Sequence, residues 1–330
     1  MSSYGVTARV APVHLPSDPK KFLNTFSITP NSLLDPNASA AQEGETTVML
    51  PGYGAGIGFF FLNFASLSKW VLNTPTRSRK ANASTPLAPR RFFAVDWLGM
   101  GRSARPSFPS IKYTKDNVQS RVSQAESFFI DSLEEWRETM GIQKMNLIGH
   151  SLGGYLSVVY ALRHPDRVSR LILLSPAGVP HGPDSLVAEE EFSETVPQGA
   201  SADSTAPAWK PSRDEVESQH KMAKEKRSQS TFRRFAMWAW EEGWSPFQLV
   251  RGLAFWGPML VGKYSARRFA HLTEEEVRDM HDYVWHITAA KGSGEYCICK
   301  SLGPVAFFIR LNSGCLMVFA STSPHARSIR

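Results

Sequence analysis

The stretch that decides the fold is Met145–Gly178, which reads "MNLIGHSLGGYLSVVYALRHPDRVSRLILLSPAG". It begins with a short apolar run that ends in Gly-His-Ser-Leu-Gly, and a helical pattern follows over Leu152–Arg163. A second apolar run, "VSRLILL", comes directly after that helix. The order strand, glycine turn, helix, strand is typical of a parallel sheet whose strands are connected by helices.

The same alternation continues on the N-terminal side of this stretch. Thr47–Leu50 is predicted as a buried strand before the glycine-rich "PGYGAG", and "RFFAVDWLGMGRS" as a second strand before another glycine turn. Helices are predicted between the strands. The fold class is therefore α/β, a mostly parallel sheet with helices on both faces and with function at the carboxyl ends of its strands. The expected parts are a loose arm over 1–44 with at most one short element near Phe22–Ile28, a core over 45–179 and a helical cap insertion over 180–290.

Composition narrows the class of protein. The chain has 330 residues, a formal net charge of +7 and no apolar run near the roughly 20 residues of a membrane-spanning helix, so a soluble or peripheral protein is expected. A basic chain suits anionic lipid, an acidic substrate or nucleic acid, but no nucleic-acid-binding motif accompanies the charge. The N-terminus lacks a signal-peptide core, so secretion is not expected. All three cysteines lie in the last 34 residues, which leaves no disulfide framework, and we predict no metal and no cofactor.

Ser151 is the candidate nucleophile. It stands at the centre of Gly-x-Ser-x-Gly, formed by Gly149, His150, Ser151, Leu152 and Gly153, with Gly154 next. Where this motif joins a strand to a helix, the serine occupies a strained turn, and small flanking residues are needed because a Cβ would meet the neighbouring strand and helix. A glycine turn of purely structural role is the alternative.

Two backbone N–H groups are candidates for stabilising an oxyanion. Leu152 offers one at the start of a helix, and Tyr53 offers the second from "PGYGAG", with Gly54 as the alternative. Asp96 has two interpretations, a catalytic acid or a residue that holds its own turn by accepting backbone N–H groups. The second is favoured, because the expected chain order is serine, acid, histidine, and Asp96 precedes Ser151.

These motifs together resemble a known family. "PGYGAG" before a phenylalanine run, "AVDWLGMGRS", "GHSLGG", "RHPDRV" and a tryptophan-rich, arginine-containing stretch are similar to the α/β-hydrolase fold. More narrowly, they resemble the fungal cardiolipin-specific deacylases and their lysophosphatidic-acid acyltransferase-like relatives, over roughly residues 15–296. The resemblance implies a serine hydrolase acting on phospholipid acyl esters, in cardiolipin remodelling and at mitochondria. The other location left open is the cytoplasm or a peripheral membrane site.

The acid and base that this family uses are not identified in the sequence. The resemblance implies a late aspartate and a final histidine in the motif His-x-x-x-x-Asp, yet no aspartate follows Asp282. Glu295 is the last carboxylate, and His325 is a weak candidate base near the end of the chain. Residues 291–330 are therefore expected to form an aberrant tail in place of the final core strands, as in a truncated or misread version of a longer hydrolase. Without a base, Ser151 would be a weak nucleophile.

Aromatic and basic residues gather in the expected cap. Such a mixture suits an anionic membrane surface, although the aromatics would equally form the small core of the cap. The resemblance favours the lipid interpretation. The residues assigned to a lipid surface are Arg233, Arg234, Trp238, Trp240 and Trp244.

The predicted activity is hydrolysis of a phospholipid acyl ester through an acyl-serine intermediate. Two alternatives remain open at this point. The first is transfer of the acyl group to a lysophospholipid. The second, from another class, is a non-catalytic lipid-surface or scaffold protein, which the missing acid and base would suit.

Overall fold

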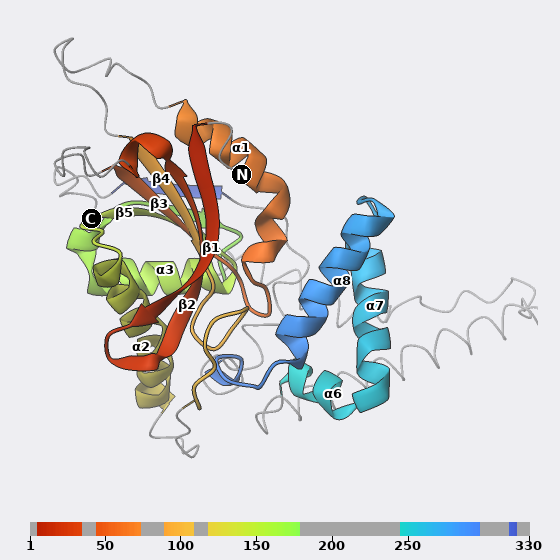
Figure 1. The fold of residues 1–330 in the computed structure, drawn as a ribbon. Helices are drawn as coiled ribbons and strands as arrows, with labels where there is room; N and C mark the ends of the chain where they lie inside the picture. The colour runs from red at the N-terminus through yellow and green to blue at the C-terminus, as the bar shows by residue number, and fades with distance from the viewer. Residues whose placement is uncertain are drawn as a thin grey trace, which may run out of the picture. The chain divides into compact units, whose positions relative to one another are not determined.

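The computed structural model describes residues 5–34, 44–73, 89–108, 118–178, 245–297 and 317–321. The chain divides into two units, and all of these residues except Gly178 belong to the unit that comprises Met1–Ala177 and Glu241–Arg330. Its sheet has seven strands in the order β1-β2-β4-β3-β5-β6-β7 (Figure 1). The predicted α/β class is confirmed.

The four central strands are parallel and agree with those predicted. They are β3 (Glu45–Leu50), β4 (Arg90–Val95), β5 (Met145–His150) and β6 (Val168–Leu174). Strand β3 lies between β4 and β5 and is parallel to both. The chain therefore passes from β4 to the opposite side of β3 to form β5. Ligands bind at such a switch point in open α/β sheets, where the carboxyl ends of neighbouring strands meet.

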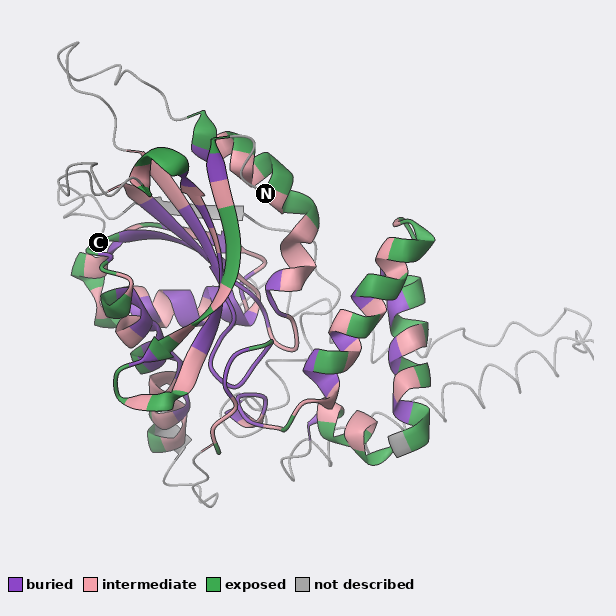
Figure 2. Cartoon of the chain, in the orientation of Figure 1, coloured by how far each residue is buried: buried purple, intermediate pink, exposed green. Residues whose placement is uncertain are grey.

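Helices connect these strands and cover both faces of the sheet. They are the 3-10 turn η2 (Ile57–Phe60), α1 (Phe61–Leu72), α2 (Val118–Thr139), α3 (Leu152–Arg163) and the 3-10 turn η4 (Pro165–Arg167). Phe92 belongs to the core cluster against which α1 packs, whereas the ring of Phe93 meets Trp136 of α2 at 5.7 Å. Successive strand residues point to opposite faces, so burial on both faces explains the continuous apolar runs. Figure 2 shows the resulting buried centre of the sheet.

The N-terminal residues differ from the loose arm that was expected. Strands β1 (Val6–Leu15) and β2 (Asp18–Pro30) form a long antiparallel hairpin, and β2 pairs with β4. A short 3-10 turn, η1 (Asn31–Leu33), follows. Pro12 is tolerated within β1 because β1 is an edge strand of the sheet.

The C-terminal part contributes one described strand. Within the region expected to be an aberrant tail, β7 (Met317–Ser321) pairs antiparallel with β6. This pairing places a segment of residues 291–330 in the sheet.

Three helices precede that segment, within the region expected to be a cap. They are α6 (Pro246–Gly252), α7 (Gly257–Arg268) and α8 (Glu274–Ala289), with the 3-10 turn η5 (Ala254–Trp256) between α6 and α7. Helices α6 and α8 each begin with a capping box, at Ser245 and Thr273. The rest of the expected cap, 180–244, lies outside the described residues. Among the described helices, none has the length and apolar character needed to cross a membrane.

Candidate active site around Ser151

Ser151 occupies a sharp turn between β5 and α3. Its backbone has φ 52° and ψ −118°, a conformation that costs free energy for a residue with a Cβ. Backbone hydrogen bonds of Ser151 hold the turn, in addition to the Tyr155 N–H that donates to its carbonyl at 3.2 Å as α3 begins. The Ser151 N–H donates to the Leu174 carbonyl at 3.0 Å, and the Ser151 carbonyl accepts from the N–H groups of Gly154 and Ala177, both at 2.9 Å. The surrounding backbone therefore imposes the strained geometry that the motif predicts.

The glycines of the motif are required by close backbone contacts. A Cβ at Gly149 would lie 2.5 Å from the Gly153 carbonyl oxygen, and a Cβ at Gly153 would lie 2.5 Å from the carbonyl oxygens of Leu50 and Pro51. Real Cβ atoms do not approach oxygen so closely. The absence of these side chains lets α3 begin directly against the ends of β3 and β5.

The loop after β3 packs against the candidate nucleophile. A Cβ at Gly52 would lie 2.9 Å from the Ser151 Cβ, so this part of the loop passes beside the serine side chain. Tyr53, the next residue, and Leu152, the first residue of α3, are the predicted oxyanion donors. The N–H of Leu152 is among the first four of the helix, which have no acceptor within the helix itself. These two roles stay predictions.

Asp96 fixes the loop from the end of β4. It is fully buried, and its carboxylate accepts hydrogen bonds from the backbone N–H of Ile57 at 2.7 Å, from the N–H of Arg102 at 2.9 Å and from the amide of Asn24 at 2.8 Å. Burial raises the pKa of Asp96, and these hydrogen bonds act in the opposite direction. The bonds fit the interpretation of Asp96 as a residue that holds turns and not as a catalytic acid.

Helix α8 reaches the same loop through Tyr283. The hydroxyl oxygen of Tyr283 accepts a hydrogen bond from the Gly58 N–H at 3.1 Å. At Gly56, a Cβ would lie 2.2 Å from that oxygen and 2.9 Å from Asp96 Oδ1. Tyr283 thus holds the backbone of this loop, a contact that the sequence did not reveal because its helix is more than 200 residues from the loop.

Replacing Asp96 by asparagine is expected to lower the free energy of unfolding by about 2 kcal/mol. The new amide group would direct N–H hydrogens at the N–H of either Ile57 or Arg102, whichever way it turned, and leave a buried donor unsatisfied. Urea unfolding measures the loss. Asp131→Asn, at an exposed position of α2, is the matched control, and equal stability of the two variants would contradict the assigned role.

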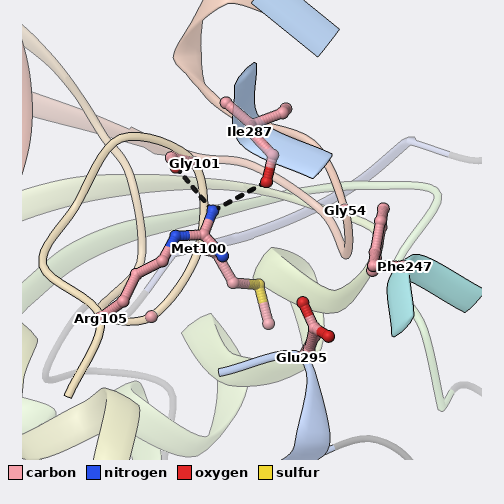
Figure 3. A pocket seen from close by; sticks show the side chains of 8 residues that line it. Gly54, Met100, Gly101, Arg105, Phe247, Ile287 and Glu295 are labelled. Atoms are coloured by element: carbon pink, nitrogen blue, oxygen red, sulfur yellow. Dashed lines mark hydrogen bonds between the residues drawn. The ribbon is translucent and has the colours of Figure 1, made fainter. Parts of the chain in front are cut away.

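A small polar cavity lies beside the loop, between the β4 turn and the helices. Arg105 donates hydrogen bonds to the carbonyls of Gly101 at 2.8 Å and Ile287 at 2.9 Å (Figure 3). Glu295 forms an ion pair with Arg251 and accepts from the Ser245 hydroxyl at 2.6 Å. The cavity holds only about 20 Å³, room for one water molecule, so these groups connect the helices to the core and do not form a substrate site.

A second cavity is large and apolar. It has a volume of about 330 Å³, within the usual range for small-molecule sites, and it extends from the loop after β3 into the space between α6, α7 and α8. Its lining includes Tyr53, Gly54, Phe59, Phe247, Leu260 and Tyr264. The described lining contains no charged side chain. The sequence did not predict this cavity, because its walls come from segments separated by about 200 residues.

The acid and base remain unassigned. Within the described ranges, no histidine or carboxylate is hydrogen-bonded to the Ser151 hydroxyl. The neighbouring His150 ring contacts Phe60 edge-on, and burial, with a smaller effect of Arg268, lowers the pKa of His150. The weak candidate His325 lies outside the described residues, as do the predicted lipid-surface residues Arg233, Arg234, Trp238, Trp240 and Trp244.

Comparison with known proteins identifies the class. The pattern of the alpha/beta hydrolase fold matches residues 66–251, and the chain belongs to this family.

Several relatives have names that describe enzymes acting on lipids. The chain is 36% identical, over 78% of its length and 49% of the relative, to "1-acylglycerol-3-phosphate O-acyltransferase" of Arabidopsis thaliana. It is 32% identical, over 89% of its length and 55% of the relative, to "Probable 1-acylglycerol-3-phosphate O-acyltransferase" of Oryza sativa subsp. japonica. It is also 32% identical, over 83% of its length and 62% of the relative, to "(Lyso)-N-acylphosphatidylethanolamine lipase" of Homo sapiens. The chain thus spans between about half and three fifths of the length of these relatives.

Proposed function

We propose that this chain is a serine hydrolase that cleaves acyl esters of phospholipids or lysophospholipids. The observation that carries the proposal is Ser151, which stands on a strained turn with the glycine loop after β3 packed against its Cβ. The Ser151 oxygen would attack the ester carbonyl carbon, and the N–H groups of Tyr53 and Leu152 would stabilise the oxyanion. Collapse of this intermediate releases the alcohol and leaves an acyl-serine, which water then hydrolyses. The serine proton passes to a general base that is not identified, and from that base to the leaving alcohol.

The apolar cavity supports a lipid substrate. It begins at Tyr53 and Gly54, next to the proposed oxyanion position, and apolar and aromatic groups dominate its walls. An acyl chain would be bound there by removal of its apolar surface from water. The names of the relatives agree with a lipid that carries a phosphate-containing headgroup. Cardiolipin and a mitochondrial location, which the resemblance implies, stay predictions.

Acyl transfer is the alternative within the same chemistry. In that reaction a lysophospholipid hydroxyl, instead of water, would accept the acyl group from Ser151. The names of the two plant relatives favour it. The sequence lacks the His-x-x-x-x-Asp motif implied by the acyltransferase-like relatives, which favours hydrolysis.

A fluorophosphonate probe tests the proposal, because it labels only an activated serine. Labelling of the full chain that disappears in Ser151→Ala is the expected result. Product analysis then separates the reactions: free fatty acid and lysophospholipid indicate hydrolysis, whereas a new diacyl lipid from lysophosphatidic acid and an acyl donor indicates transfer. Parallel assays with cardiolipin, phosphatidylethanolamine and N-acylphosphatidylethanolamine define the headgroup. An intact chain without labelling would support the non-catalytic lipid-surface or scaffold alternative.

A further inference from the structure

Helices α6 and α7 expose an unusual concentration of apolar side chains. Of the twelve large hydrophobic side chains exposed in the described residues, seven lie within residues 249–264. These seven, the α6–α7 apolar patch, are Leu249, Leu253, Phe255, Trp256, Met259, Leu260 and Tyr264. Phe255 is 86% exposed and Trp256 is 57% exposed, although aromatic rings of this size normally bury most of their surface. A concentration of this kind marks an interaction surface.

The charges on the segment that carries the patch have one sign, whereas the neighbouring helix α8 carries the exposed acidic residues Glu274, Glu275, Asp279 and Asp282. Residues 246–273 contain four Lys or Arg residues and no Asp or Glu. Arg251 is engaged by Glu295, whereas Lys263, Arg267 and Arg268 are exposed on α7. Met259, Lys263 and Arg267 recur every four residues, so the exposed cations continue along the face of α7 that carries part of the patch. Figure 2 shows the exposed stretches along α6 and α7.

We propose that the α6–α7 apolar patch docks on an anionic phospholipid surface. Exposed tryptophan and phenylalanine enter the boundary between headgroups and acyl chains, and nearby Lys and Arg are attracted by anionic headgroups. The assignment differs from the lipid surface predicted at Arg233–Trp244, since it rests on described residues further along the chain.

The patch continues into the apolar cavity. Leu260 and Tyr264 are exposed members of the patch and also line the cavity of about 330 Å³ that reaches Tyr53. A docked α7 would therefore let an acyl chain pass from the bilayer into the cavity with little exposure to water. This delivery role rests on the proposed function, whereas docking itself does not require catalysis.

Vesicle flotation of the full chain carrying Ser151→Ala tests docking without turnover. We expect binding to vesicles of phosphatidylcholine mixed with phosphatidylglycerol, and a decrease of about tenfold or more when Phe255→Ala and Trp256→Ala are combined. Leu162→Ala is the matched control, because Leu162 is 77% exposed on α3, away from the patch. All three side chains are exposed, so unchanged melting temperatures verify that the variants are folded.

A second pair of variants tests the charge. Lys263→Gln combined with Arg267→Gln is expected to reduce binding to the anionic vesicles by roughly tenfold, while binding to phosphatidylcholine alone stays the same. Arg9→Gln combined with Lys20→Gln, two exposed cations of the N-terminal hairpin, is the control. Equal vesicle binding by the parent and the aromatic variant would overturn the proposal. The proposal would also be overturned if the parent chain were a dimer and the aromatic variant a monomer, because a second copy of the chain would then cover the patch.

Activity measurements distinguish membrane docking from the proposed hydrolase function. With Ser151 restored, the aromatic variant should hydrolyse a soluble short-chain ester at the parental rate and a vesicle phospholipid more slowly. Loss of vesicle binding in a chain that hydrolyses neither substrate would support the docking surface and refute the proposed function. An equal rate on vesicles for parent and variant would refute the delivery role.

Discussion

Ser151→Gly is expected to abolish acyl-ester hydrolysis and, at the same time, to raise the free energy of unfolding by about 1 kcal/mol. Activity falls by roughly 10⁴-fold or more because the nucleophile is gone. Stability rises because glycine adopts φ 52° without the clash of a Cβ, and this gain exceeds the entropy that glycine adds to the unfolded chain. Denaturant unfolding and a short-chain ester assay measure the two effects.

Ser151→Ala is the matched control for this prediction. Alanine removes the hydroxyl but retains the Cβ, so this variant should lose activity without the gain in stability. A glycine variant no more stable than the alanine variant would show that the turn is unstrained. Retained hydrolysis in both variants would place the nucleophile elsewhere.

Gly153→Ala is expected to lower the free energy of unfolding by about 3 kcal/mol or more. The added methyl group would lie 2.5 Å from two backbone carbonyl oxygens, those of Leu50 and Pro51, and neither is the end of a flexible side chain. To relieve the contact, α3 must move away from the end of β3, which also separates Leu152 from the loop that carries Tyr53. Thermal unfolding, together with fluorophosphonate labelling of Ser151, measures both consequences.

Gly252→Ala provides the comparison. Gly252 ends α6, and a Cβ there meets nothing within 4 Å, so alanine should leave stability unchanged or raise it slightly. If Gly153→Ala were as stable as Gly252→Ala, the close approach of α3 to β3 would not be a requirement of the fold.

The local parts of the site were predictable because their signals are local. A strand, a glycine turn and a helix follow one another within 19 residues, Met145–Arg163, and apolar periodicity identifies each. Asp96 accepts the Arg102 N–H in its own turn, a bond that its residue type and position predict.

The sequence did not predict contacts between segments that are far apart along the chain. The sequence indicates at most one short element near Phe22–Ile28 within a loose arm, and it does not predict the long hairpin. The residues of β2 form a sheet strand through pairing with β4, as in Thr25 with Val95. Tyr283 reaches Gly58 over a separation of 225 residues, and no local pattern encodes that bond. Propensity is a weak guide where tertiary partners decide the structure.

The sequence by itself determined the α/β class, the candidate nucleophile Ser151 and the glycines that its turn requires, since each depends on neighbours along the chain. The tertiary structure alone decided which aromatic side chains of the helices are buried and which are exposed. Phe269 is buried between α7 and α8 whereas Phe255 is not, although both are phenylalanines in the same aromatic-rich part of the sequence. The physical reason is that burial depends on which surfaces meet in space: Phe269 packs in the cluster that α7 forms with α8, whereas Phe255 lies at a position that stays 86% exposed.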